Sequence, residues 1–213
     1  MRNLLIIGAG GFGREVYNSA LESIGYGKDF IVKGFLDDRL DALDTFSNYP
    51  PVIDRIDSYS IKPDDVFVCA LGTVTIKKKV CILSRGGDFL TLIHKDTYIS
   101  MNTKIGKGCI LLSGARIHCD VSIGDFVVVQ PYAIIGHDVV IGDWSHINAL
   151  ADCGGGSRIG ECVTLHTSSF VLPSGIVEDN STVGAGSVVL RRVKEGSTVF
   201  GVPAKIVLTP KKQ

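Results

Sequence analysis

The chain has 213 residues, and its 22 Lys and Arg are balanced by 22 Asp and Glu, so the formal net charge is zero. A chain of this length forms one or two domains and buries roughly 70% of the surface that it exposes when unfolded. No basic excess is available for nucleic-acid phosphates or anionic lipid, and no apolar run approaches the roughly 20 residues that span a bilayer. We therefore expect neither nucleic acid nor membrane as a partner.

The N-terminus and the cysteines point to a cytoplasmic protein with reduced thiols. Gly8 interrupts the first apolar run after four residues, and no small-residue cleavage pattern of a signal peptide follows. The six cysteines form no Cys-x-x-Cys pair and no zinc-like group with histidine, so we expect neither disulfides nor a metal.

The first ninety residues or so predict a small Rossmann-like α/β unit. Residues 4–7 read as a strand, residues 8–13 (GAGGFG) as a Gly-x-Gly-x-x-Gly turn, and residues 14–24 as a helix. Such a turn brings backbone amides at the start of a helix close to a phosphate. Two further strands are expected over residues 31–36 and 66–70.

The ends of these strands carry the candidate substrate residues. Asp37 and Asp38 follow the second strand, about where an acidic residue meets a ribose hydroxyl, and Gly72 follows the third. A dinucleotide needs two βαβαβ halves, and only one precedes the repeats described next, so the unit has room for a single nucleotide. Two alternatives stay open: the glycine turn only packs the helix on the strand, or Asp38 is a solvated turn residue. A helical stretch over residues 77–84 is expected to be an exposed face.

A six-residue period fills the second part of the chain. Fourteen of the fifteen residues taken at every sixth position from Ile105 to Val189 are branched aliphatics, and the residue two places before each is small. This spacing matches neither an α-helix nor a flat strand. It is typical of a coil of three short parallel strands, each with one aliphatic and one small side chain pointing inward. Gly106, Gly124, Gly142 and Gly160 recur every eighteen residues, which predicts eighteen residues per coil and an unbroken register to about residue 194.

His137 is the candidate general base within these coils. It follows a corner glycine, and its neighbour Asp138 supplies a carboxylate that raises the basicity of an imidazole and fixes its tautomer. One coil later, eighteen residues on, stands Gly155 in a run of three glycines. This spacing predicts a narrow slot beside the imidazole that suits a thin thioester arm. The alternative is that His137 and Asp138 are ordinary corner residues.

The chain resembles a known enzyme family over nearly its whole length. The aliphatic and glycine hexapeptides resemble the left-handed β-helix of hexapeptide-repeat acyltransferases. Residues 135–147 (IGHDVVIGDWSHI) and the glycine-rich opening closely resemble sugar acyltransferases of the NeuD and PglD kind, and residues 201–205 (GVPAK) resemble the terminal signature of acetyl-CoA-dependent members. The left hand of the coil is implied by this resemblance alone.

The resemblance implies an acetyl-CoA-dependent transfer of an acetyl group to an amino or hydroxyl group of a nucleotide-linked sugar. It implies His137 as the base and Asp138 as the residue that raises its basicity, where family members often carry Glu. It also implies a homotrimer. The positions that match acetyl-CoA contacts are His146, Gly155, Thr167 and Ala185, and those that match the substrate-binding loops are Gly11, Phe12, Gly13, Asp37, Asp38 and Gly72.

The expected architecture is thus a Rossmann-like nucleotide-sugar-binding domain over residues 1–95 and a left-handed parallel β-helix with a C-terminal cap over residues 96–213. Two other functions remain open. A γ-type carbonic anhydrase would share the repeat, but it pairs two histidine ligands five residues apart, and the repeat histidines here are spaced by 19, 9 and 20. A non-catalytic protein that binds nucleotide sugars is the second. The sugar, the nucleotide, the acceptor group, the acyl length and the pathway are left open by the sequence.

Overall fold

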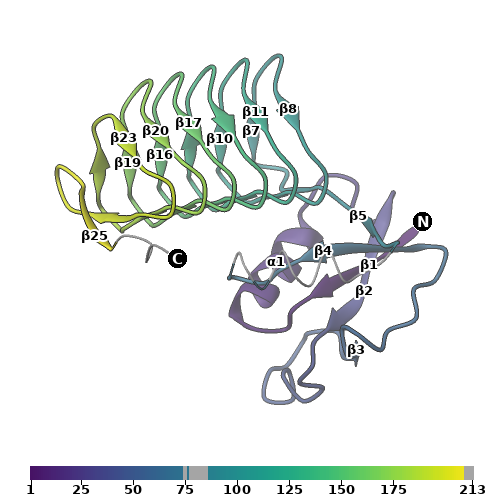
Figure 1. The fold of residues 1–213 in the computed structure, drawn as a ribbon. Coiled ribbons are helices and arrows are strands. Elements are labelled where there is room, and N and C mark those ends of the chain that lie inside the picture. Colours follow the sequence, from purple (N-terminus) through teal and green to yellow (C-terminus); the bar gives the residue numbers. More distant parts are fainter. Residues whose placement is uncertain (74–75, 77–85, 209–213) are drawn as a thin grey trace. The chain divides into compact units, whose positions relative to one another are not determined.

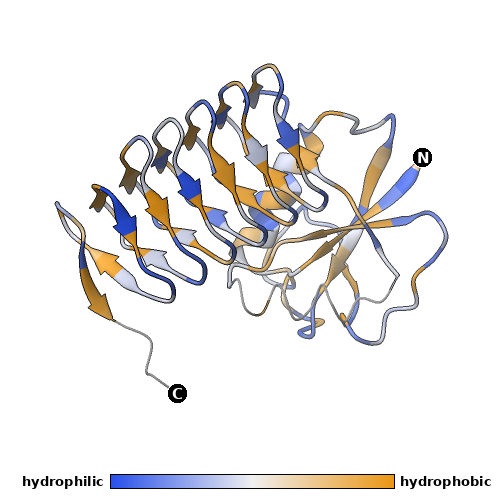
Figure 2. Cartoon of the chain, turned by 45° about the horizontal axis from the view of Figure 1, so that its top comes forward, coloured by the Kyte–Doolittle hydropathy of each residue, from blue (hydrophilic) through white to orange (hydrophobic). Residues whose placement is uncertain are grey.

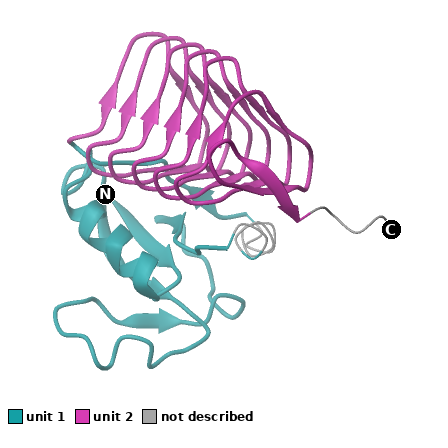
Figure 3. Cartoon of the chain, turned by 90° about the vertical axis from the view of Figure 1, so that its left-hand side faces the viewer, with its two compact units in different colours: residues 1–95 teal, residues 96–213 magenta. Residues whose placement is uncertain are grey.

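A computed structural model describes residues 1–73, 76 and 86–208 of the chain (Figure 1). The chain divides into two compact units, Met1–Lys95 and Asp96–Gln213, coloured teal and magenta in Figure 3. The helix expected over residues 77–84 lies outside the described residues.

The N-terminal unit is built on a five-stranded sheet in the order β3-β2-β1-β4-β5, and its printed strand pairs are all parallel. Its elements are β1 (Arg2–Ile7), α1 (Gly11–Leu21), β2 (Phe30–Leu36), β3 (Val52–Asp54), β4 (Asp65–Cys69), β5 (Asp88–Phe89) and β6 (Leu92–Ile93). The central strand β1 is buried over Leu4–Ile7 because strands of a parallel sheet are covered on both faces. The expected strands and helix are present, whereas β3, β5 and β6 are too short to leave a pattern in the sequence.

The C-terminal unit is a solenoid of short strands that stack into three parallel sheets, here called faces 1, 2 and 3 in the order in which the chain visits them (Figure 1). Face 1 has the order β22-β19-β16-β13-β10-β7, with strands Val188–Val189, Phe170–Val171, Asp152–Cys153, Ile134–Ile135, Arg116–Ile117 and Tyr98–Ile99. Face 2 has the order β23-β20-β17-β14-β11-β8, with strands Arg192–Val193, Ile176–Val177, Arg158–Ile159, Val140–Ile141, Ser122–Ile123 and Lys104–Ile105. Face 3 contains β25-β24-β21-β18-β15-β12-β9, with strands Lys205–Leu208, Thr198–Phe200, Thr182–Val183, Thr164–Leu165, His146–Ile147, Val128–Val129 and Ile110–Leu111.

The repeating positions of the hexapeptide pattern form the buried interior of the solenoid. The inward aliphatic residues from Leu111 to Val189 are at most 4% exposed, and the small residues two places before them are also buried. Hydrophobic segments accordingly recur on successive coils (Figure 2). The predicted fold class, an α/β unit followed by a left-handed parallel β-helix, is confirmed.

The recurrent corner glycines make room for a carboxylate of the next coil. A Cβ on Gly106, Gly124 or Gly160 would overlap an aspartate oxygen one coil further on. These oxygens accept hydrogen bonds from the backbone amide that follows each glycine: Asp125 from Lys107 at 2.9 Å, Asp143 from Asp125 at 2.8 Å and Asp179 from Glu161 at 2.9 Å. The eighteen-residue glycine period therefore reflects a ladder of coil-to-coil hydrogen bonds.

The register departs from the sequence expectation at both ends. Within the C-terminal unit, pairing at a spacing of eighteen already includes Tyr98 of β7, in the strand before the one that contains residue 105. It holds up to the pair Phe170 and Val188, but Ile176 pairs with Arg192, sixteen residues on. The expectation of an unbroken register to residue 194 is therefore wrong, because the corner between the inward Val189 and Val193 is two residues short.

The last coil ends in an antiparallel hairpin of β24 and β25. Its connection, residues 201–204, is tied to β22, because Gly201 accepts a hydrogen bond from the Val188 amide at 3.0 Å and Ala204 donates one to the Val188 carbonyl at 2.8 Å. The signature resembling that of acetyl-CoA-dependent enzymes thus closes the end of the solenoid.

Candidate active site

His137 and Asp138 lie at the corner between faces 1 and 2, after β13 and before β14. Nδ1 of His137 is 2.7 Å from Oδ2 of Asp138, and both side chains are about two-thirds exposed. Asp138 has a φ of 59°, a left-handed conformation that aspartate tolerates, and its amide donates to the Cys119 carbonyl at 3.1 Å. The corner thus turns the carboxylate onto Nδ1 and leaves Nε2 as the ring nitrogen available to a substrate.

The imidazole lies over Gly155 of the next coil. A Cβ at Gly155 would be 2.5 Å from Nε2 and 2.8 Å from Cε1 of His137, closer than side-chain atoms approach one another. Gly136 is required in a similar way, because a Cβ there would lie 2.7 Å from the Gly155 amide nitrogen. Only glycine at both positions permits this placement of the ring.

One backbone amide beside the imidazole is left over for a ligand. Gly154 donates to the Val171 carbonyl and Gly156 to the His137 carbonyl, each at 2.8 Å. Within the described part of the chain, the Gly155 amide donates to no carbonyl, although the Gly155 carbonyl accepts from Ser174 at 2.9 Å. Of the three glycines, Gly155 is therefore the one whose N–H can stabilise a developing oxyanion.

Sequence reasoning missed Cys119, which occupies the same corner one coil before His137. The spacing of eighteen residues was the available signal. A hydrogen bond to Asp120, with burial and the nearby Asp138 carboxylate, raises the pKa of the Cys119 thiol. The group is thus held as a thiol rather than as a nucleophilic thiolate.

The other candidate acetyl-CoA residues lie elsewhere on the solenoid. Thr167 and Ala185 are exposed at the corner between faces 3 and 1, and they stack because Thr164 of β18 pairs with Thr182 of β21 at the same spacing. His146 is an outward residue of β15 on face 3 and is only 4% exposed. Within one chain, face 1 therefore separates the corner of Thr167 and Ala185 from the corner of His137.

The candidate substrate residues of the N-terminal unit meet at one edge of its sheet. Ile7, the last residue of β1, pairs with Leu36 of β2 and Cys69 of β4, so the segments that follow all three strands emerge side by side. The Ala9 amide donates to Oδ2 of Asp37 at 2.8 Å. The glycine turn, Asp37–Asp38 and the segment leading to Gly72 are thereby gathered at the carboxyl edge of the sheet, where open α/β sheets bind ligands.

Asp37 and Asp38 have different surroundings. Burial of the Asp37 carboxylate acts to raise its pKa, but hydrogen bonds from the Ala9 amide and from Arg39 outweigh burial and lower the pKa below its ordinary value of 3.8. Both oxygens of Asp37 are thus engaged in holding the turn. Asp38 is exposed, and among the described residues it accepts only a long 3.4 Å bond from the Ile56 amide, so it is the better placed of the two to meet a ribose hydroxyl.

The glycines of the turn also differ. A Cβ on Gly13 would overlap the Gly8 carbonyl oxygen, so this glycine is needed for α1 to pack on β1. A Cβ on Gly11 or Gly72 would meet no atom within 4 Å, which leaves their backbones open to a ligand. Phe12 is half-buried.

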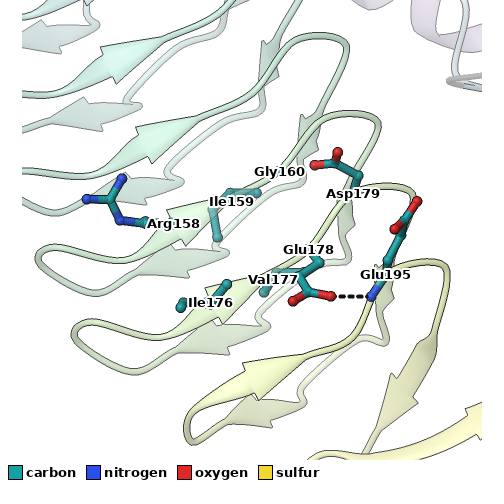
Figure 4. A pocket seen from close by; sticks show the side chains of 8 residues that line it. All are labelled: Arg158, Ile159, Gly160, Ile176, Val177, Glu178, Asp179 and Glu195. Carbon is teal, nitrogen blue, oxygen red and sulfur yellow. Dashed lines mark hydrogen bonds between the residues drawn. The ribbon is translucent and has the colours of Figure 1, made fainter.

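A separate cavity of about 400 Å³ lies at face 2 near the end of the solenoid (Figure 4). It is lined by Arg158, Ile159, Gly160, Ile176, Val177, Glu178, Asp179 and Glu195, none of which is a candidate site residue. Glu178 accepts from the Arg192 guanidinium and from the Glu195 amide, and Asp179 accepts from the Glu161 amide. These two carboxylates therefore join successive coils.

Over residues 1–73, 76 and 86–208, no group of three or more His, Cys, Asp or Glu side chains is placed to hold a metal ion. In the same ranges, no helix is long and apolar enough to cross a membrane.

Comparison with solved structures finds full-length similarity. The acetyltransferase domain of PglB from Neisseria gonorrhoeae in complex with acetyl coenzyme A is 30% identical, with a TM-score of 0.84, and the match covers 97% of this chain and 99% of that one. PerB from Caulobacter crescentus, in complex with CoA and GDP-perosamine, is 26% identical, with a TM-score of 0.85 and 97% coverage of both chains.

Among curated proteins, the chain is 26% identical over 137 residues to GDP-perosamine N-acetyltransferase of Escherichia coli O157:H7, which is 63% of this chain and 54% of that relative. It is also 30% identical over 126 residues to the bifunctional protein GlmU of Acinetobacter baylyi, and the match spans 28% of GlmU. The chain thus covers about half or less of the length of these curated relatives.

Two family models match the chain, one in the N-terminal α/β unit and one in the solenoid. Residues 3–82 match the PglD N-terminal domain, and residues 120–151 match the bacterial transferase hexapeptide of six repeats. The second match contains the His137 corner. With the similarity to the PglB domain along nearly its entire length, the chain belongs to the NeuD/PglD-type sugar acyltransferases, the hexapeptide-repeat enzymes that carry a leading α/β domain.

Proposed function

We propose that the protein transfers an acetyl group from acetyl-CoA to an amino or hydroxyl group of a nucleotide-linked sugar. The observation that carries the proposal is the His137–Asp138 pair at 2.7 Å, with its imidazole laid over the glycine of the next coil. The bound molecules of two similar proteins support it, since the PglB domain holds acetyl coenzyme A and PerB holds CoA and GDP-perosamine.

His137 acts as the general base in this proposal. Its Nε2 takes the proton from the acceptor group as the acceptor nitrogen or oxygen attacks the thioester carbonyl, while Asp138 holds Nδ1 and stabilises the imidazolium that forms. The bond from the carbonyl carbon to the acceptor forms, the bond to sulfur breaks, and the proton passes from His137 to the leaving thiolate. The Gly155 amide donates to the carbonyl oxygen while that oxygen carries negative charge.

The transfer is direct and uses no acyl-cysteine. Cys153, near the candidate base in the next coil, is fully buried, and burial raises the pKa of its thiol. The Cys119 pKa is raised as well. Neither cysteine has the depressed pKa and accessible thiolate of a catalytic nucleophile.

The nucleotide part of the acceptor binds to the N-terminal unit. The open backbone of the glycine turn faces the phosphates, and Asp38 meets the ribose, while Asp37 holds the turn in shape. Phe12 and Gly72 border the same carboxyl edge of the sheet.

The functional enzyme in this proposal is a homotrimer. Two observations support it. The acetyl-CoA residues Thr167 and Ala185 lie at a different corner from His137, and face 1 between them carries outward apolar residues, including Ile134 at 37% exposure. A neighbouring copy packed on this side would supply one half of each acetyl-CoA groove, with His137 of one chain facing Thr167 and Ala185 of another.

Release of the CoA thiol tests the function. The purified protein is incubated with acetyl-CoA and a panel of UDP-, GDP-, dTDP- and CMP-linked amino and deoxy sugars, and we expect thiol release and an acetylated sugar with at least one of them. The H137A variant serves as the control. Binding of a nucleotide sugar without turnover of any panel member would instead favour the non-catalytic alternative.

A further inference from the structure

Arg14, a half-buried residue near the start of α1, packs its guanidinium on an aromatic ring. The central guanidinium carbon lies 3.6 Å from the ring centroid of Phe46, in the long loop between β2 and β3. A guanidinium at this distance over a ring face forms a cation–π interaction. The two residues are 32 positions apart in the chain.

Further rings hold Phe46 against the sheet. The ring centroids of Phe46 and Tyr49 are 6.5 Å apart, those of Tyr49 and Tyr17 are 5.4 Å apart, and those of Tyr17 and the buried Phe35 of β2 are 5.9 Å apart. This cluster links the loop to α1 and to the sheet. It orients the planar guanidinium before any ligand arrives, which lowers the entropy cost of binding.

The guanidinium of Arg14 has no anionic partner in the described ranges. By contrast, Arg39 bonds to Asp37 and Arg2 to Asp88. The donor N–H groups of Arg14, which lie in the guanidinium plane, are therefore left for a ligand while its face is on Phe46.

Arg14 shares one side of α1 with the open part of the glycine turn. Residues three and four positions apart lie on the same helix face, so Arg14 lies beside Gly10 and Gly11. A Cβ on either glycine would meet nothing within 4 Å, so the space beside this part of the turn is open. A basic residue in a first turn is disfavoured by the helix dipole, and this first turn contains no acidic residue to offset it. An anion in this space would relieve the unfavourable charge.

We propose that Arg14, oriented by Phe46, binds the second phosphate of the sugar nucleotide and makes the enzyme selective for sugars linked to a nucleoside diphosphate over those linked to a nucleoside monophosphate. The inference rests on the proposed function and narrows its substrate class. The guanidinium donates two parallel hydrogen bonds to phosphate oxygens, a geometry that lysine does not reproduce. The amides of the turn hold the other phosphate, and Asp38 the ribose.

The same diphosphate chemistry occurs in coenzyme A, so the test includes both ligands. Isothermal titration calorimetry measures the binding of GDP, GMP, UDP, UMP and acetyl-CoA to the full chain. We expect GDP or UDP to bind at least tenfold more tightly than the matching monophosphate. R14A is expected to weaken diphosphate binding by about 10- to 100-fold, the range for hydrogen bonds to a charged group, and to leave monophosphate and acetyl-CoA binding unchanged.

Three further variants separate the contributions of the charge of Arg14, its planar donor groups and the Phe46 ring. R14K keeps the charge but loses the planar donor pair, and we expect partial recovery. F46L keeps Arg14 but removes the ring, and we expect a smaller loss confined to the diphosphates. R2A, which removes another half-buried arginine of the same unit, is the matched control and is expected to bind like the parent protein. Thermal melting checks that all variants fold.

The outcomes distinguish this inference from the function on which it rests. If R14A keeps the preference for diphosphate over monophosphate, or if it loses acetyl-CoA affinity instead, the role of Arg14 is wrong while the transferase proposal stands. If the parent protein binds none of the four nucleotides, nucleotide-sugar binding itself is overturned, and the role of Arg14 with it.

Discussion

At the scale of single residues, the candidate site depends on which side chains are absent as much as on which are present. The His137 imidazole occupies space that any side chain at Gly155 would take, and Gly136 lets the Gly155 backbone approach. Asp138 contacts Nδ1 from a backbone in the left-handed conformation. Two predictions concern this arrangement.

The first prediction concerns the base. H137A is expected to lower kcat by about 10²- to 10⁴-fold with little change in KM, because proton removal in the transition state is lost while both substrates still bind. Steady-state thiol release with a sugar that turns over measures this change. H118A is the control, because His118 lies at the corresponding corner of the preceding coil, 19 residues before His137. Its kcat is expected to stay within a few-fold of that of the parent protein. Near-full activity of H137A, or an acetyl-cysteine detected by mass spectrometry, would contradict direct transfer.

The second prediction concerns the glycine under the ring. G155A places a methyl group 2.5 Å from the resting position of Nε2, so the imidazole must move away from the reacting atoms. We expect kcat to fall by about 10²-fold, since a displacement of about 1 Å has a cost of this order. The melting temperature is expected to change little, because the ring is exposed and free to rotate outward. A fully active G155A would show that this contact is not needed for catalysis.

At the scale of elements, the N-terminal unit uses strand ends to build its turn. The carboxylate of Asp37, at the end of β2, bonds to the amide of Ala9, after β1, and thereby joins two segments that the sequence separates by 28 residues. The turn between β1 and α1 is thus supported from the neighbouring strand. Its role as support and its role as a ligand site are separable by mutation.

The support is expected to depend on pH. Because the pKa of Asp37 is lower in the folded protein than its ordinary value of 3.8, its contribution to stability is present above that value and is lost as the pH falls through the lower folded pKa. D37N is expected to reduce the free energy of unfolding of this unit by about 1–3 kcal/mol at pH 7, the range for hydrogen bonds to a charged group, and by less at pH 3, which is below the ordinary pKa of 3.8. Urea denaturation at both pH values measures the difference.

D38N is the matched control for this change, since Asp38 is exposed and makes one long hydrogen bond. It is expected to leave stability almost unchanged at both pH values. An equal loss of stability by D37N at pH 3 and pH 7 would mean that the charge of Asp37 does not support the turn.

The ligand role of the turn is tested at Gly11. A side chain at this position meets no protein atom within 4 Å, so G11V is expected to fold normally while its bulk blocks the approach of the phosphates. The KM for the sugar nucleotide is expected to rise by tenfold or more, and the KM for acetyl-CoA to stay within about twofold. Kinetics with each substrate varied in turn measure this split. Equal weakening toward both substrates would indicate a packing defect instead.

At the scale of the whole molecule, the distribution of the candidate acetyl-CoA residues over two corners leads to a prediction about assembly. Light scattering is expected to give the mass of three chains of 22.8 kDa each at micromolar concentration. F170R places a charge on the outward side of face 1 and is expected to shift the protein toward monomers and to abolish turnover, since burying an unpaired charge is unfavourable. V140R, an outward position of face 2, is the matched control. A monomeric parent protein with full activity would contradict a shared site.

The sequence alone determined the class of fold, the interior of the solenoid and the position of His137 beside Gly155. These features depend on local spacing: a coil repeats every eighteen residues, so side chains that stack in space keep a constant separation along the chain. Strand β1, α1 and the glycine turn were predictable for a similar reason, because they form one continuous segment.

The tertiary structure alone decided what depends on segments brought together from unrelated positions. The shortened corner before Val193, the three brief strands β3, β5 and β6, and the engagement of both Asp37 oxygens leave no periodic signal. Arg14 lies over Phe46 only because the loop after β2 folds back along α1. Such contacts form only when complete elements pack together. The repeat, by contrast, can be recognised from any few consecutive hexapeptides of the chain.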